Sequence, residues 1–185
     1  ARDGTSWLST GWRGGRTRSD AAYCLTVPEG WRSEDLAAFV RERLAERDVA
    51  ADRVDAAASG NAPVLFTGVA MAHARGARLG PVEAYATAGV SNPAALPTDR
   101  DALRAPPEAR DGDGDASDRD DRLPDGEYVA GTVNVVVGTT RDLAPGALAN
   151  LVAVAAEARA AALLDRVGVP GTTSDAIVAA CDPDG

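Results

Sequence analysis

One strand-and-helix signal constrains the fold of this chain more than any other part of the sequence. It begins at 127–139, where a two-residue alternation places Thr132 and Asn134 on one face of a strand and valines on the other. Pro145 then opens a long stretch rich in Ala, Leu and Val that continues to about Val167. The pattern predicts a strand followed by a long helix. Because the helix is apolar on almost all sides, it is expected to be mostly buried.

Shorter patterns predict the remaining elements and the fold class. Runs of β-branched and apolar residues predict further strands at 7–10, 21–27, 64–69, 82–88 and 175–181. An amphipathic surface helix is expected from an N-cap at Ser33 to about Arg47. These elements indicate an α+β fold with a mainly antiparallel or mixed sheet, one long buried helix and one surface helix. We expect 64–69, 82–88 and 131–138 to lie in a common sheet beside the long helix.

Three segments give weaker signals. Residues 48–62 are ambiguous, and residues 14–16 and 70–81, rich in Gly and Arg, are expected to form loops. At 185 residues the chain has the length of a single domain, 1–185, interrupted by an acidic insertion at about 99–125. That insertion is too poor in apolar residues to form a packed core, so we expect it to be mobile.

A calcium-binding loop is the functional alternative for the acidic insertion. Carboxylates alternate with glycines after Asp111, as they do in calcium loops. The EF-hand spacing requires a Gly and a Glu where Ala116 and Arg122 stand. The spacing therefore favours a solvated loop.

The charge balance excludes one class of partner. The chain carries 28 acidic residues against 19 Lys and Arg residues, all of which are arginine, for a formal charge of −9. Such a surface lacks the basic footprint of a nucleic-acid-binding protein. An excess of Asp together with the absence of Lys favours a halophilic protein in a cytoplasm of high salt, where ions screen the repulsion between carboxylates. An acidic cytosolic protein from a GC-rich genome is the alternative.

Cysteine usage and hydropathy indicate a cytoplasmic protein. Cys24 and Cys181 are far apart and belong to no C-x-x-C pair, so we expect two free thiols of a reducing compartment, with a single disulfide as the alternative. No apolar run is expected to span a bilayer, and the first residues show no signal-peptide pattern. We therefore expect no membrane partner, and we leave a homo-oligomer open.

The candidate catalytic residues are Glu83 and Ser91. On the strand predicted at 82–88, Glu83 and Thr87 share a face, and the chain then enters a turn through Ser91. A carboxylate bordered by small apolar residues suits a general base, and a serine in a turn suits a nucleophile or a hydrogen-bond donor. A strand glutamate that faces solvent and a turn serine that bonds its own backbone are the alternatives.

Seven further residues are candidates for binding a substrate, because each offers a polar side chain near a predicted strand end, in a loop or on the long helix. They are Thr87, Asn92, Thr132, Asn134, His73, Glu157 and Ser174. The alternative for the threonines is simply their strand propensity. His73 is the only histidine, so a Ser-His-Asp scheme would have to use it. One histidine and two separated cysteines do not make a zinc site, and we predict no metal and no cofactor, with a divalent-metal site built of carboxylates as the alternative.

Six short motifs follow one another in a specific order. They are WLSTGWRGG at 7–15, ATAGVSNPA at 86–94, GTVNVVV at 131–137, GALAN at 146–150, EAR at 157–159 and GTTSDA at 171–176. In this order they resemble the adenosylcobinamide amidohydrolases of corrinoid salvage, and the resemblance covers most of the chain outside the acidic insertion. Arg13 stands where the resemblance leads us to expect Asn.

The resemblance implies an amidohydrolase whose substrate is a corrinoid. Its expected reaction is hydrolysis of the amide that links aminopropanol to adenosylcobinamide, which gives adenosylcobyric acid for cobalamin salvage. A corrinoid carries many amides at its rim, which suits the neutral hydrogen-bonding groups of Thr132, Asn134 and Ser174. The alternatives are a corrinoid-binding protein without hydrolytic activity and an amidase or peptidase of another substrate class.

Overall fold

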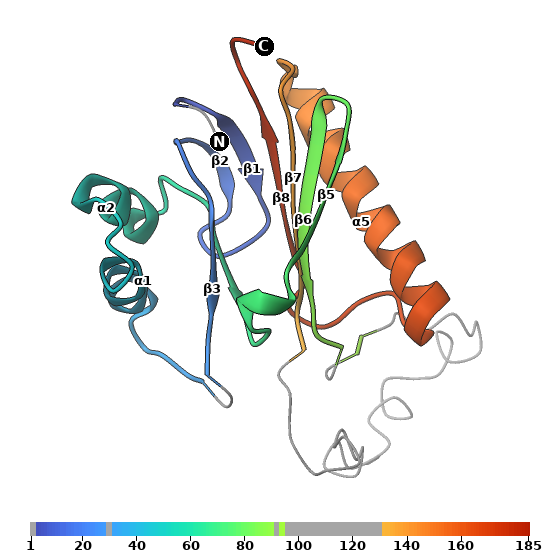
Figure 1. The fold of residues 1–185 in the computed structure, drawn as a ribbon, viewed down its shortest axis with the longest axis horizontal. Coiled ribbons are helices and arrows are strands. Elements are labelled where there is room, and N and C mark those ends of the chain that lie inside the picture. Colours follow the sequence, from blue (N-terminus) through green and yellow to red (C-terminus); the bar gives the residue numbers. More distant parts are fainter. Residues whose placement is uncertain (1–2, 29–30, 91–92, 95–130) are drawn as a thin grey trace, which may run out of the picture.

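The computed structural model describes residues 3–28, 31–90, 93–94 and 131–185. Within these residues the chain forms an α+β fold, as predicted, with one mixed six-stranded sheet, a two-stranded sheet and one long helix (Figure 1). The elements are β1 Ser6–Ser9, β2 Gly15–Arg18, β3 Tyr23–Thr26, α1 Leu36–Ala45, α2 Ala51–Ser59, β4 Val64–Thr67, the 3-10 turn η1 Met71–His73, β5 Arg75–Leu79, β6 Val82–Ala88, β7 Val133–Thr139, α5 Pro145–Val167 and β8 Ala176–Cys181.

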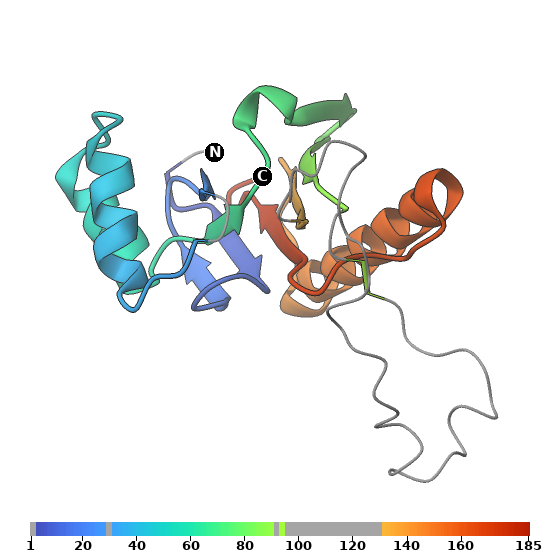
Figure 2. The same cartoon turned by 90° about the horizontal axis from the view of Figure 1, so that it is seen from below.

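The large sheet has the strand order β2-β1-β8-β7-β6-β5, with β7 and β8 parallel and the other neighbours antiparallel. The parallel pair is possible because α5 carries the chain from the end of β7 back to the start of β8. The sheet is curved, and α5 packs against its convex side (Figure 2). We call this side the helix face; it is formed by the alternate residues that include Val82, Ala84, Val137 and Ala179.

The burial predicted for α5 is wrong, although its bounds match the prediction. Leu148 and Leu163 are its buried residues, whereas Val154, Leu164 and Val167 are exposed apolar side chains. One sheet can cover only one side of a helix. The alanines on the other side reflect helix propensity and do not indicate burial.

The expectation that no apolar run approaches the length of a membrane span is also corrected. Among the described residues, α5 is the one helix that is long and apolar enough to cross a membrane by length and composition alone. A helix that packs on a core can pass the same test, so the finding is weak evidence for a span.

The two-stranded sheet was not predicted as a separate unit. We expected 64–69 to join the sheet of β6 and β7, but β4 pairs in parallel with β3. The two strands lie on the concave side of the large sheet, where Leu65 and Cys24 pack against Trp7, Val178 and Val136. The helices α1 and α2 connect β3 to β4. They pack on the side of the two-stranded sheet that faces away from the large sheet. A sequence pattern defines a strand but not its partner, because pairing depends on distant residues.

Two segments predicted as loops are edge strands. β2 pairs with β1, and β5 forms a hairpin with β6 through a turn in which Gly80 has a φ of 55°. The residues of β5 are all exposed and those of β2 mostly so, which explains why neither shows an apolar alternation. The ambiguous segment 48–62 contains α2, and the side chain of Asp35, not that of Ser33, caps α1 by accepting from Ala38 N at 2.9 Å.

Candidate active site

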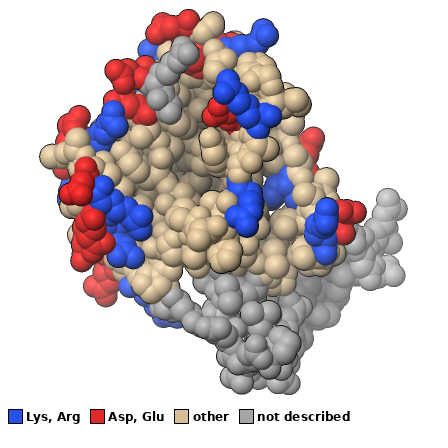
Figure 3. Space-filling view, viewed as in Figure 1, with Lys and Arg blue, Asp and Glu red and all other residues tan. Residues whose placement is uncertain are grey.

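The concave face of the large sheet carries the candidate site. Glu83, Tyr85 and Thr87 share this face of β6, as the alternation predicts, and the facing hollow is visible in Figure 3. The register places Glu83 opposite Gly138 of β7 and Thr87 opposite Asn134. Glu83 therefore lies toward one end of the face and Thr87 toward the other.

At the Glu83 end the face forms a pocket of about 190 Å³, which we call the Glu83 pocket. Six of its lining residues are Trp7, Glu83, Tyr85, Val136, Ala180 and Asp182. Its walls thus combine aromatic and small apolar side chains with two carboxyl groups. A concave site with few polar groups on an apolar floor is the usual form of a small-molecule site.

Two neighbours orient the Glu83 carboxylate. Arg78 Nη1 lies 3.4 Å from Glu83 Oε1, and Tyr85 Oη donates to Glu83 Oε2 at 3.4 Å. The Glu83 side chain is 43% exposed, so water reaches the carboxylate. Tyr85 in turn lies against Gly76 of β5, where an added Cβ would come within 2.7 Å of the ring. The glycine therefore makes room for the phenol beside the pocket.

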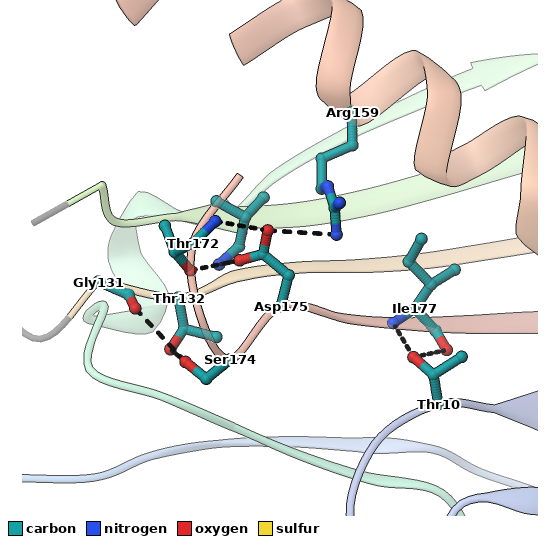
Figure 4. Close-up of polar contacts among 9 residues, drawn as sticks. Thr10, Gly131, Thr132, Arg159, Thr172, Ser174, Asp175 and Ile177 are labelled. Atoms are coloured by element: carbon teal, nitrogen blue, oxygen red, sulfur yellow. Dashed lines mark hydrogen bonds and ion pairs between the residues drawn. The ribbon is translucent and has the colours of Figure 1, made fainter. Parts of the chain in front are cut away.

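At the opposite end, the residues at the starts of β7 and β8 form a polar rim, defined here as Gly131, Thr132 and Ser174. The hydroxyls of Thr132 and Ser174 are hydrogen-bonded at 2.7 Å, and Ser174 Oγ donates to Gly131 O at 3.5 Å (Figure 4). Thr132 is buried and Ser174 is exposed. The rim thus presents a hydrogen-bonded hydroxyl pair at the surface.

The chain on both sides of the predicted Ser91–Asn92 turn reaches this end of the sheet. Gly89 N donates to Thr132 O at 3.1 Å, and Ala94 N donates to Gly171 O at 3.0 Å. Ser91 and Asn92 themselves lie outside the described residues, as does the acidic insertion. The motif segments near 89, 94, 131 and 171 therefore meet at one end of the fold.

A second polar group lies between the two sheets. Asn134 Nδ2 donates to Phe66 O at 2.8 Å and lies 3.9 Å from Cys24 Sγ, so this amide ties β7 to the β3–β4 pair. Burial raises the pKa of the Cys24 thiol, and the neighbouring Asn134 and Thr87 side chains oppose the shift. The thiol is therefore protonated at neutral pH. Cys24 and Cys181 are both free, in line with the sequence prediction.

Two buried atoms of this group have no partner among the described residues. They are Thr87 Oγ1 and Asn134 Oδ1, on side chains that lie opposite each other in the register. Thr87 is 4% exposed and Asn134 is 2% exposed. Buried polar atoms without a partner are costly, which marks this position as a site for a water or another hydrogen-bonding group.

The structure separates Glu83 from the other predicted site residues. We expected it beside Thr132 or Asn134. Instead, Glu83 lies four positions before Thr87 on β6, which places it about 13 Å along the strand from the Thr87–Asn134 pair. Alternation correctly gave the face on which Glu83 lies, but the position along that face follows from the register. The structure brings together Thr87, Thr132, Asn134 and Ser174 and leaves Glu83 at the other end.

Two other predicted residues lie elsewhere. Glu157 is exposed on α5, and α5 covers the helix face, so Glu157 is not brought to the concave face. His73 is exposed in η1, close in sequence to β5. Within the described part of the chain, no group of three or more His, Cys, Asp or Glu side chains is arranged to hold a metal ion.

Sequence reasoning missed Asp175, which has the densest set of contacts near the rim. Its carboxylate accepts from Val133 N and Thr172 N, both at 2.8 Å, and from the Thr172 hydroxyl. Arg159 Nη1 of α5 lies 3.2 Å from Asp175 Oδ2 (Figure 4). The available signal was the motif GTTSDA, in which Asp175 directly follows Ser174.

Comparisons with known proteins support the resemblance inferred from the motifs. A profile of the family described as Adenosylcobinamide amidohydrolase matches residues 1–185. The Adenosylcobinamide amidohydrolase of Halobacterium salinarum (strain ATCC 700922 / JCM 11081 / NRC-1) is 51% identical over 191 residues, which cover 100% of this chain and 70% of the relative. No solved structure matches the chain with statistical significance.

Proposed function

The chain belongs to the adenosylcobinamide amidohydrolase family, and we propose that it hydrolyses the amide between aminopropanol and the corrinoid of adenosylcobinamide. The products are adenosylcobyric acid and aminopropanol. The observation that carries this function is the family match over all 185 residues. Corrinoid binding without hydrolysis and hydrolysis of an unrelated amide are not favoured by that match.

The Glu83 pocket suits the attack of water on the amide. In the proposed step, Glu83 takes a proton from water as the oxygen adds to the amide carbon. The carbon–nitrogen bond then breaks, and the proton passes from Glu83 to the leaving nitrogen, which departs as the amine. Arg78 and Tyr85 hold the carboxylate in place for both transfers.

The size of the pocket limits what it can hold. A volume of about 190 Å³ suits the aminopropanol arm, whereas whole drug-sized ligands occupy pockets of about 300–1,000 Å³. The corrin macrocycle must therefore lie outside the pocket, beyond the part of the concave face that β3 and β4 cover. Thr132 of the polar rim lies six residues before Gly138 of β7, the partner of Glu83, so the rim is about 20 Å from Glu83 along the strands. The exposed Ser174 hydroxyl, held by the buried Thr132, would bind amides at the far edge of the macrocycle.

The role of Ser91 stays a proposal with a direct companion test. If Ser91 attacks the amide carbon, an acyl-enzyme forms and Ser91→Ala abolishes turnover as strongly as loss of the base. If water attacks directly, Ser91→Ala has a mild effect. The position of Gly89 at the rim, far from Glu83 along β6, favours direct attack by water.

The function is tested by incubating the chain with adenosylcobinamide and following both products by mass spectrometry. Formation of adenosylcobyric acid and free aminopropanol in equal amounts supports the proposal. A simple peptide amide and a corrinoid without the aminopropanol arm serve as control substrates. Binding of the corrinoid without product would establish the non-catalytic alternative, and hydrolysis of the peptide amide alone would establish an amidase of another class.

A further inference from the structure

We propose that Asp175 is a positioning residue for substrate binding: with Arg159 and Thr172 it sets the Thr132–Ser174 hydroxyl pair on which the corrinoid edge rests. The inference rests on the proposed function for the identity of the substrate. Its structural basis is independent of the Glu83 pocket, because Asp175 lies at the opposite end of the sheet.

The Asp175 carboxylate joins three parts of the fold. One oxygen accepts from the backbone of Val133 at the start of β7, and the other accepts from the backbone of Thr172 in the loop before β8. Arg159 adds α5 to the same carboxylate at 3.2 Å. The Asp175 side chain is only 5% exposed, so these partners, and not water, stabilise its carboxylate.

The loop leaves no room for a different arrangement around this carboxylate. A Cβ added at Gly171 would lie 2.5 Å from Asp175 Oδ2 and 3.4 Å from Arg159 Nη2. The backbone therefore passes directly over the ion pair. A side chain at this glycine would displace the pair or the loop.

The link to the rim follows from sequence neighbours. Val133 directly follows Thr132, and Asp175 directly follows Ser174, so one carboxylate fixes the backbone beside each hydroxyl. Figure 4 shows the Asp175 side chain directed to Arg159 and Ser174 directed the other way, to Thr132. Moving Asp175 should change the 2.7 Å spacing of the hydroxyl pair without touching the Glu83 pocket.

The variant Asp175→Asn tests this coupling. Asn cannot accept at both positions, and it leaves Arg159 without its charge partner. We expect the KM for adenosylcobinamide and the Kd for adenosylcobyric acid, measured by equilibrium dialysis, to rise about tenfold, the scale of one hydrogen bond. We expect kcat to change by less than about threefold, because the reacting groups lie elsewhere.

A double-mutant cycle with Ser174→Ala distinguishes positioning from a purely structural role. If Asp175 acts through the hydroxyl pair, Asp175→Asn adds little to the Kd of the Ser174→Ala protein. The inference is wrong if the two substitutions raise Kd independently, so that their factors multiply in the double variant. It is also wrong if kcat falls in parallel with the folded fraction of Asp175→Asn. Asp165→Asn is the matched control, because it removes the partner of an exposed arginine, Arg166, on the same helix; its binding should be unchanged.

Thr172 provides a second variant should Asp175→Asn fold poorly. Thr172→Val removes the hydroxyl that donates to Asp175, and Thr172→Ser keeps it. Weaker binding in Thr172→Val together with wild-type binding in Thr172→Ser supports the inference, and equal binding in both overturns it. If every rim variant forms product and binds the corrinoid like the wild type, the inference about Asp175 is wrong and the proposed hydrolysis stands. A chain that binds the corrinoid but releases no product refutes the hydrolysis alone, and one that does neither refutes both.

Discussion

Glu83 is the single residue on which the proposed chemistry most depends. Replacing its carboxylate with an amide keeps the shape of the side chain but removes the proton acceptor. We expect Glu83→Gln to lower kcat by about 10²–10⁴-fold, the usual effect of a positioned acid–base group. Corrinoid affinity should change little. The measurement is the initial rate of adenosylcobyric acid release.

Glu157→Gln is the control for this variant. Glu157 is an exposed glutamate on α5, on the other side of the sheet, so its replacement should leave the rate unchanged. Wild-type turnover in Glu83→Gln would show that the base lies elsewhere on the chain.

Asp48 is a residue whose backbone conformation is unfavourable for its side chain. It has a φ of 55°, and the bonds Val49 N to Leu44 O (3.2 Å) and Asp48 N to Ala45 O (3.1 Å) form the Schellman end of α1. Glycine adopts this conformation without strain. Asp48→Gly should therefore raise the free energy of unfolding by about 0.5–1 kcal/mol.

Urea denaturation measures this effect, with Asp48→Ala as the matched variant. Alanine removes the same charge but retains a Cβ, so it should not stabilise the protein. Equal stabilisation by both substitutions would assign the gain to the lost charge and not to the backbone.

At the residue scale, the sequence predicted which face of a strand a side chain lies on better than which residues of the neighbouring strand it lies beside. Glu83, Tyr85 and Thr87 lie on one face as alternation requires, but only the pairing with β7 shows which of them lies near Asn134. Arg13 is a different case. Its φ is 49°, a conformation that Asn tolerates better than Arg, so the Asn expected from the resemblance has a backbone reason at this position.

At the scale of elements, the orientation of α5 can be tested with two leucines of the same helix. Leu148 is 1% exposed and packs on the helix face, whereas Leu164 is 52% exposed. Leu148→Ala should lower the free energy of unfolding by about 2–5 kcal/mol. Leu164→Ala should change it by less than about 0.5 kcal/mol.

Chemical denaturation of both variants gives the comparison directly. A large loss of stability in Leu164→Ala would show that the outer side of α5 is covered in solution, which the described residues do not show. Equal small effects would instead contradict the packing of α5 on the sheet.

Elements with a buried side were predictable, and those without one were not. The strands at 82–88 and 133–139 alternate because one side of each packs on a core. β2 and β5 lie at the sheet edges and have largely exposed residues, so their Gly- and Arg-rich sequences show no period. The parallel pairing of β3 with β4 spans two helices, a distance over which local patterns carry no information.

At the scale of the whole molecule, the motif order allowed the family to be identified before the structure was known, but it did not locate the site. Segments at 89, 131 and 171 meet at the rim because β6 ends where β7 and β8 begin. That meeting point follows from topology. Asp175 was missed for the same reason, since its partners Val133 and Arg159 are distant in sequence.

The net charge of the whole chain predicts how its stability depends on salt. With 28 acidic and 19 basic residues, repulsion between carboxylates destabilises the compact state at neutral pH. Added KCl screens that repulsion, because the Debye length falls from about 10 Å at 0.1 M to about 3 Å at 1 M. We expect Tm at pH 7 to rise over this range, because the compact state gains most from the screening. The same titration at pH 4.6, near the isoelectric point, should be nearly flat because the net charge has vanished. A Tm at pH 7 that ignores KCl, or an equal rise at both pH values, would contradict the screening argument.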